Sequence, residues 1–158
     1  MNDDEDFEIK DGVLVKYHGE DEDVVVPAGV TEIWDYAFED CINLKTIELP
    51  DTLSNISDGI FYEYEGTVIV NLSKYNPYKF DYEARKRCLS YNASSLLKDN
   101  IEEEKLNVWI NYFRGNGDLY YDEMLKDKAL LQFVLKYKCL LLEDVMELLN
   151  RSSEENLT

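Results

Sequence analysis

The stretches VVVPAGVTEIWDYAF (residues 24–38) and IELPDTLSNISDGIF (residues 47–61) match one another at a constant offset of 23 residues. A further step of 23 residues places Ile47 on Val70 and Leu49 on Leu72. Internal similarity at a period of this length is typical of stacked structural repeats. The matched pairs are Val24/Ile47, Val26/Leu49, Pro27/Pro50, Val30/Leu53, Ile33/Ile56, Asp35/Asp58 and Phe38/Phe61.

Each unit has the pattern of a short strand followed by a return segment. Val24 and Val26 alternate with other residues, as in a half-buried strand. Pro27 ends the strand because proline has no N–H to donate to a neighbouring strand. The apolar Ile33 and Phe38 then anchor the returning chain. A single coil of this kind cannot bury its inner face, so we expect stacked coils that share one core.

The segment before the first unit has the alternation of a β-hairpin. Its apolar residues lie on both sides of Asp11-Gly12, a pair that favours a tight hairpin turn. We expect this hairpin to cover the open end of the first coil, which would otherwise expose apolar surface. The alternating residues are Phe7, Ile9, Val13, Val15 and Tyr17.

The stretch VPAGVTEIWDYAFEDCINLKTIELP (26–50) resembles the unit of the BspA-type leucine-rich repeats, with Pro, Val, Thr, Ile, Ala-Phe, Cys and Leu at that family's offsets. Cys41 falls where the family has a buried cysteine. DFEIKDGVLVKYHGEDEDVVVP (6–27) resembles the hairpin that often precedes the first coil. The resemblance covers residues 7 to 72. It implies a binding scaffold of a kind found on many bacterial cell surfaces.

The second half of the chain changes to a helical period after residue 82. The pattern EEEKLNVWINYF (102–113) places Trp109 on an apolar face, so we interpret this ring as core. Arg85, Lys86 and Arg87 are interpreted as the polar face of a helix. RGNGD (114–118) predicts a helix stop, and the tail over 151–158 is expected to fray. The expected helices span 82–92, 102–113, 122–137 and 141–150.

These patterns together predict an α+β fold. We expect a short leucine-rich-repeat solenoid of about three coils of 23 residues, with an N-terminal β-hairpin cap and a C-terminal helical cap. The first domain would span residues 1–72, and a helical module would span residues 73–158. We expect the two to pack as one body.

The charge of the chain is concentrated in its first half. The sequence has 34 acidic and 16 basic residues, and 19 of the acids but only three lysines lie within residues 1–72. Such a field repels nucleic acid and lipid headgroups and attracts basic protein surfaces. We therefore expect no direct nucleic-acid or membrane partner. The alternative is that the charge serves solubility alone.

The start of the chain and its cysteines predict a reducing compartment. MNDDEDFEIK (1–10) lacks the basic and apolar regions of a secretory signal, which favours a cytoplasmic location. Cys41, Cys88 and Cys139 are odd in number and far apart, so we expect reduced, mostly buried thiols.

No motif predicts an enzyme. His18 is the only histidine and lies in a turn, which leaves no Ser-His-Asp or Cys-His set. The run EDED (20–23) lacks the alternation and the distal glutamate of a calcium loop. We expect no catalytic residue, no metal and no cofactor.

The charge instead predicts a protein–protein interaction, with an acidic repeat surface that binds a basic partner. A surface dense in carboxylates can imitate the phosphates of a nucleic acid and occupy a basic groove. In size and charge the chain resembles phage-encoded acidic inhibitors such as anti-CRISPR proteins, which implies a nucleic-acid-binding protein as the target. The alternative is a BspA-type scaffold or adhesin-like binding module.

Trp34 and Tyr36 are larger than the coil requires, because they align with Ser57 and Gly59 of the next coil. Two readings remain open for Trp34: it packs on the hairpin near Tyr17, or it is exposed at an interface, where Trp and Tyr are enriched. The expected partner-binding residues are Asp21, Glu22, Asp23, Glu32, Trp34, Asp35, Tyr36, Glu39, Asp40 and Glu48.

Overall fold

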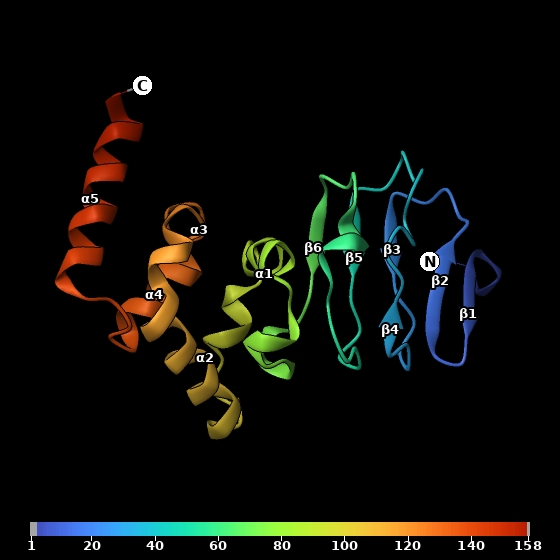
Figure 1. Ribbon diagram of the computed structural model, residues 1–158, viewed down its shortest axis with the longest axis horizontal. Helices are drawn as coiled ribbons and strands as arrows, with labels where there is room; N and C mark the ends of the chain where they lie inside the picture. Colours follow the sequence, from blue (N-terminus) through green and yellow to red (C-terminus); the bar gives the residue numbers. More distant parts are fainter. Residues whose placement is uncertain (1–2, 158) are drawn as a thin grey trace.

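The computed structural model describes residues 3–157, with side chains as far as residue 154. The molecule is elongated, and its strands and helices are separated along its length (Figure 1). The N-terminal hairpin lies at one end, the paired strands follow, and the helices occupy the other end. The predicted α+β class is confirmed as a mixture of helices and strands.

The predicted hairpin consists of β1 (Phe7–Lys10) and β2 (Val13–Tyr17), which pair antiparallel. Asp11 and Gly12 both have positive φ, 51° and 79°, as a tight two-residue hairpin turn requires. β2 then pairs in parallel with β4 (Glu32–Ile33), which completes a sheet of order β1-β2-β4. The hairpin is therefore joined by backbone hydrogen bonds to the first coil.

A second sheet contains β3 (Asp23–Val25), β5 (Thr46–Glu48) and β6 (Thr67–Ile69), all parallel and in this order. Val24 pairs with Ile47, as the offset of 23 predicts. The next step was predicted wrongly, because Ile47 pairs with Val68 rather than Val70. A shift of two residues leaves the same side chains facing inward, and both valines are buried. Alternation alone therefore cannot distinguish the two registers.

The shorter step has a local cause in the turn before β6. The Tyr64 hydroxyl lies 2.8 Å from Lys45 O, just before β5, and 2.6 Å from Thr67 O, at the start of β6, and donates to these backbone oxygens. A Cβ at Gly66 would collide with Lys45 O and with the Tyr64 ring, so only glycine permits this close approach. The tight turn brings β6 alongside β5 earlier than the first repeat predicts.

Hydrogen bonding at the repeat spacing continues past residue 72. The Val70 N–H donates to the Asn92 side chain at 3.0 Å, and the Leu72 N–H donates to Ser95 Oγ at 3.0 Å, at offsets of 22 and 23 residues. Ile56 also forms a parallel bridge with Phe80. The repeat pattern thus extends into the first helical elements. The short 3₁₀ helices are Asp4–Asp6, Asp58–Phe61, Leu72–Lys74, Pro77–Lys79, Ala93–Leu96 and Gly117–Tyr120.

The α-helices differ from the predicted ranges at four points. The first helix ends at Leu89 rather than at residue 92. The second helix extends beyond residue 113 and ends at Asn116, within the predicted stop at 114–118. The predicted helix over 122–137 divides at Asp127, whose side chain accepts from Ala129 N at 2.9 Å and begins a new helix. The last helix continues through Leu157, so the tail that was expected to fray is helical to that residue, and Thr158 lies outside the described residues. The helices are α1 (Tyr82–Leu89), α2 (Glu103–Asn116), α3 (Tyr121–Lys126), α4 (Lys128–Lys136) and α5 (Leu142–Leu157).

Trp109 connects α2 to the repeats by packing and by hydrogen bonds. Its side chain is 0% exposed, and its Nε1 donates to Leu72 O at 3.2 Å and to Tyr75 O at 2.7 Å. Its ring also lies beside Phe80 and Phe113. The interpretation of Trp109 as core is confirmed, and the buried side chains form one cluster from the hairpin to the helices.

Arg85 corrects the interpretation of the basic cluster as a polar face. Its side chain is buried, and its guanidinium donates to Pro77 O at 2.8 Å and to Phe80 O at 2.6 Å. It also donates to the hydroxyls of Tyr112 and Tyr120. The long side chain reaches these groups because the residue faces the junction of α1 and α2 rather than solvent.

Candidate protein-binding surface

The candidate surface begins at β4, where side chains alternate between core and solvent. Ile33 is buried, and its neighbours Glu32 and Trp34 point outward on the same face. The Trp34 N–H donates to Leu14 O at 3.0 Å, which fixes its backbone on the hairpin. The Trp34 side chain is nevertheless 52% exposed, and the Tyr17 ring contacts Phe7 and Phe38. These observations favour the hypothesis that Trp34 is exposed over the hypothesis that it packs near Tyr17.

A hollow of about 680 Å³ lies beside the indole of Trp34. It forms because the residues at the corresponding positions of the next coil, Asn55 and Ser57, are small and polar. Ser54 ties this second coil to the first, since its N–H and its Oγ both donate to Thr31 O, at 2.9 and 3.0 Å. The lining residues are Glu32, Ile33, Trp34, Asp35, Ser54, Asn55 and Ser57.

Asp35 belongs to a row of aspartates that connect successive coils. Asp35 Oδ1 accepts from Ser57 Oγ at 2.8 Å. In the next coil, Asp58 Oδ1 accepts from the Ala84 N–H at 2.6 Å. Asp81, another 23 residues along, accepts from the Asp58 N–H at 3.1 Å. The carboxylate that flanks the hollow is therefore held in place by the repeat itself.

The position of the Asp35 side chain also explains why glycine, at Gly59, stands in the second coil where the first has Tyr36. A Cβ at Gly59 would collide with the Asp35 side chain, so the second coil requires glycine there. The residue 23 positions before Asp35 is Gly12, in the hairpin turn, so no equivalent aspartate restricts Tyr36. Tyr36 also has a φ of 65°, which Gly59 does not share, so the first coil carries a large residue where the backbone of the second coil has no room for one.

Tyr36 forms a second exposed aromatic feature. Its side chain is 50% exposed, and its ring meets that of Tyr62 edge to face, with 4.9 Å between centroids. Tyr62 is also exposed and was not among the predicted residues. It aligns with Glu39 in the repeat. Its position directly after the core residue Phe61 is the sequence feature that could have predicted its exposure.

Four of the predicted binding residues lie on or beside the other sheet. Glu22 forms an ion pair with Lys45 at 2.9 Å, and Asp23 accepts from Thr46 Oγ1 at 2.8 Å. Asp21 accepts from the Tyr17 hydroxyl at 3.4 Å. Glu48 lies on β5 and is exposed. The predicted set therefore divides between the two sheets rather than forming one site.

The outer face of this second sheet carries a row of three exposed side chains, one from each strand. Glu48 pairs with Val25 of β3 on one side and with Ile69 of β6 on the other. Both aliphatic side chains are exposed, which places an acid between two apolar groups. Glu39 and Asp40, the remaining predicted residues, lie in the turn after Phe38 and are exposed.

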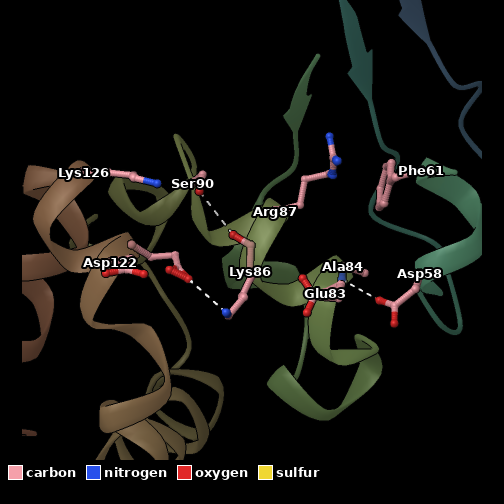
Figure 2. Close-up of a pocket in the computed structure, with 10 residues that line it drawn as sticks. Asp58, Phe61, Glu83, Ala84, Lys86, Arg87, Ser90, Asp122 and Lys126 are labelled. Carbon is pink, nitrogen blue, oxygen red and sulfur yellow. Dashed lines mark hydrogen bonds and ion pairs between the residues drawn. The ribbon is translucent and has the colours of Figure 1, made fainter. Parts of the chain in front are cut away.

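Another hollow, of about 480 Å³, lies between α1 and α3 (Figure 2). Its charged groups are largely partnered: Lys86 lies 3.8 Å from Glu123, and Arg87 lies over the Phe61 ring at 5.6 Å. Asp122 forms an ion pair with Arg151 of α5 at 3.0 Å. Figure 2 shows Lys86 and Arg87 pointing to opposite sides of α1, toward the helices and toward the repeats. The Arg87–Phe61 contact joins the helical half to the repeats, whereas the two ion pairs lie within the helical half.

The cysteines and the acidic groups do not form a reactive or metal-binding centre within residues 3–157. No cluster of three or more His, Cys, Asp or Glu side chains suits a metal ion there. Burial raises the pKa of the Cys88 thiol to about 12, and burial also raises the pKa values of Cys41 and Cys139. All three are free, and Cys41 is half-buried. Within the same range, no helix combines the length and apolarity needed to cross a membrane.

The sequence matches the family of BspA type leucine rich repeat regions, in six copies, over residues 16–107. The chain belongs to this family. The matched region covers more than half of the chain and continues beyond residue 72, as does the hydrogen bonding at the repeat spacing. No curated protein and no solved structure matches the chain.

Membership of the BspA-type family indicates a scaffold for protein–protein interaction, in a family that is generally non-enzymatic. The resemblance to acidic phage inhibitors finds no support in the family match. The predicted cytoplasmic location stays a prediction.

Proposed function

We propose that this BspA-type repeat protein is a non-enzymatic interaction protein whose acidic repeat surface binds a basic protein. The observation that carries the proposal is the half-exposed Trp34, which lines one hollow together with the acidic residues Glu32 and Asp35. In this arrangement, the hairpin and the helices cap the two ends of a solenoid, and the sides of the coils remain available to a partner.

The aromatic and acidic groups would make different contributions to binding. Trp and Tyr dominate the energies of many interfaces because their large rings are desolvated in the complex. Exposed carboxylates add little affinity each, but they raise the association rate with a basic partner and select against acidic ones. The net charge of −18 makes this steering long-ranged at low ionic strength.

In its more specific form, the proposal makes the partner a nucleic-acid-binding protein and the repeat surface an inhibitor that occupies its basic groove. The concentration of acidic residues in the first 72 positions supports this form. The second candidate is an adhesin-like binding module whose acidity serves solubility. The exposed aliphatic side chains of Val25 and Ile69 on the other sheet favour this candidate.

The test is affinity purification at low salt from the cell that makes the protein, followed by binding measurements on each purified partner. We expect affinity for the partner to fall steeply as salt rises, and to fall further in Trp34→Ala. Tyr91→Ala, which removes an exposed aromatic ring from the other half of the chain, is the matched control. A partner bound equally well at low and high salt would contradict the electrostatic proposal and favour the adhesin-like module.

A further inference from the structure

We infer that the hollow beside Trp34 binds the guanidinium group of an arginine side chain on the basic partner. This inference rests on the proposed function and specifies the chemistry at its centre. The hollow combines an aromatic face, two carboxylates and several neutral oxygen atoms within one concave site.

The indole supplies the surface for stacking. Trp34 is half-exposed, and its backbone, directly after β4, is hydrogen-bonded to the hairpin, so the ring is held at the end of a strand. Tryptophan is the best aromatic partner for a cation, and a planar guanidinium stacks on it more effectively than a compact ammonium. The geometry therefore favours arginine over lysine.

The two acidic residues that line the hollow with Trp34 supply the charge. Within residues 3–157 the Glu32 carboxylate makes no hydrogen bond or ion pair, and the Asp35 carboxylate accepts only from Ser57 Oγ and remains exposed. The residues that line the hollow include no cation. A cationic side chain entering the hollow would therefore meet two carboxylates without displacing an existing ion pair.

The far wall of the hollow supplies neutral acceptors. Ser54, Asn55 and Ser57 carry side-chain oxygens on the coil that faces the indole. A guanidinium has five N–H donors in a fixed plane, whereas an ammonium has three on a point charge. With its face on the indole, the guanidinium can direct its edge toward both the carboxylates and these oxygens.

The test compares hexa-arginine and hexa-lysine peptides, which have equal length and charge. Binding of dye-labelled peptides is measured by fluorescence anisotropy at low salt, with urea unfolding as the check on folding. We expect hexa-arginine to bind the wild-type protein about fivefold more tightly than hexa-lysine. This preference should disappear in Trp34→Ala and remain in Tyr91→Ala.

Two further readouts locate the peptide. Because Trp109 is fully buried, a change in tryptophan emission on adding unlabelled hexa-arginine reports Trp34. Glu32→Gln should lower hexa-arginine affinity more than Glu65→Gln, an exposed acid in the same half of the chain that does not line the hollow. The two substitutions change the net charge equally.

Equal affinity for the two peptides, or a preference for arginine that survives in Trp34→Ala, would overturn the arginine site. Salt-sensitive binding of both peptides in that case would leave the acidic-surface proposal standing. Absence of binding to either peptide at low salt would overturn both proposals. A response of Trp34 emission to an uncharged hexasaccharide, without one to hexa-arginine, would instead assign the hollow to a neutral ligand.

Discussion

Replacement of Arg85 by alanine should lower the free energy of unfolding by about 3 kcal/mol, because its guanidinium bonds the repeats to the helices at a buried junction. The carbonyls of Pro77 and Phe80 would lose their charged donors. A buried acceptor without a partner costs about 1–3 kcal/mol. The cation–π contact with Tyr112, at 4.8 Å, is worth up to about 1 kcal/mol more.

Two effects reduce this loss. The hydroxyls of Tyr112 and Tyr120 remain hydrogen-bonded to each other after Arg85 is removed. The cost of burying a charge also disappears with the guanidinium. The net loss of unfolding free energy is therefore about 3 kcal/mol. The stability of Arg85→Lys should lie between that of wild type and that of Arg85→Ala, because lysine keeps the charge but lacks the planar donor array.

Urea unfolding followed by the emission of the buried Trp109 would measure this change. With a slope of about 2 kcal/mol per molar urea, the midpoint should fall by about 1.5 M. Arg114→Ala is the control, since this exposed arginine makes one hydrogen bond, to Tyr137 O at 3.0 Å, and should cost under about 1 kcal/mol. A loss for Arg85→Ala no larger than that of Arg114→Ala would refute the reasoning.

Gly59→Ala should destabilise the protein by about 1–3 kcal/mol in urea unfolding, because a Cβ there meets the aspartate of the preceding coil. Gly115→Ala, in open space on α2, should instead stabilise it by about 0.5–1 kcal/mol, and a reversed order would contradict the packing. A thiol reagent at pH 8 should modify the half-buried Cys41 before the buried Cys88, which should react only on unfolding. Burial raises the pKa of Tyr75 from 10.0 to about 12, so its contribution to stability, complete below pH 10, should decline as pH rises toward 12. Tyr75→Phe should show a smaller decline over this range, measured as the urea midpoint at each pH.

The parts of the fold that sequence could predict are those set by local pattern. The hairpin follows from alternation around Asp11-Gly12, and the pairing of Val24 with Ile47 follows from the offset of 23. The pairing of Ile47 with Val68 could not be predicted, because a shift of two residues preserves the inward face.

Long-range contacts limited the remaining predictions. The burial of Arg85 depends on carbonyls and tyrosines brought together from different elements, and its place in a basic run gives no sign of them. At the candidate surface, comparison of coils singled out Trp34 as larger than the repeat requires, and the side chain is half-exposed. It could not indicate that Glu48 lies on another sheet, because the sequence does not give the separation of the two faces.

The contact between Asp35 and Gly59 limits how the repeat array can grow by duplication. Tyr36 has a φ of 65°, a conformation that Gly59 does not repeat, so a tandem copy of the first coil with the backbone of the second would place the Cβ of a second Tyr36 on the Asp35 carboxylate. A tandem copy of the second coil would place another Gly59 beside Asp58, which leaves room for that carboxylate. We therefore expect that an engineered or naturally lengthened array would be built from copies of the second coil, and that the Trp34 coil would stay single, next to the hairpin.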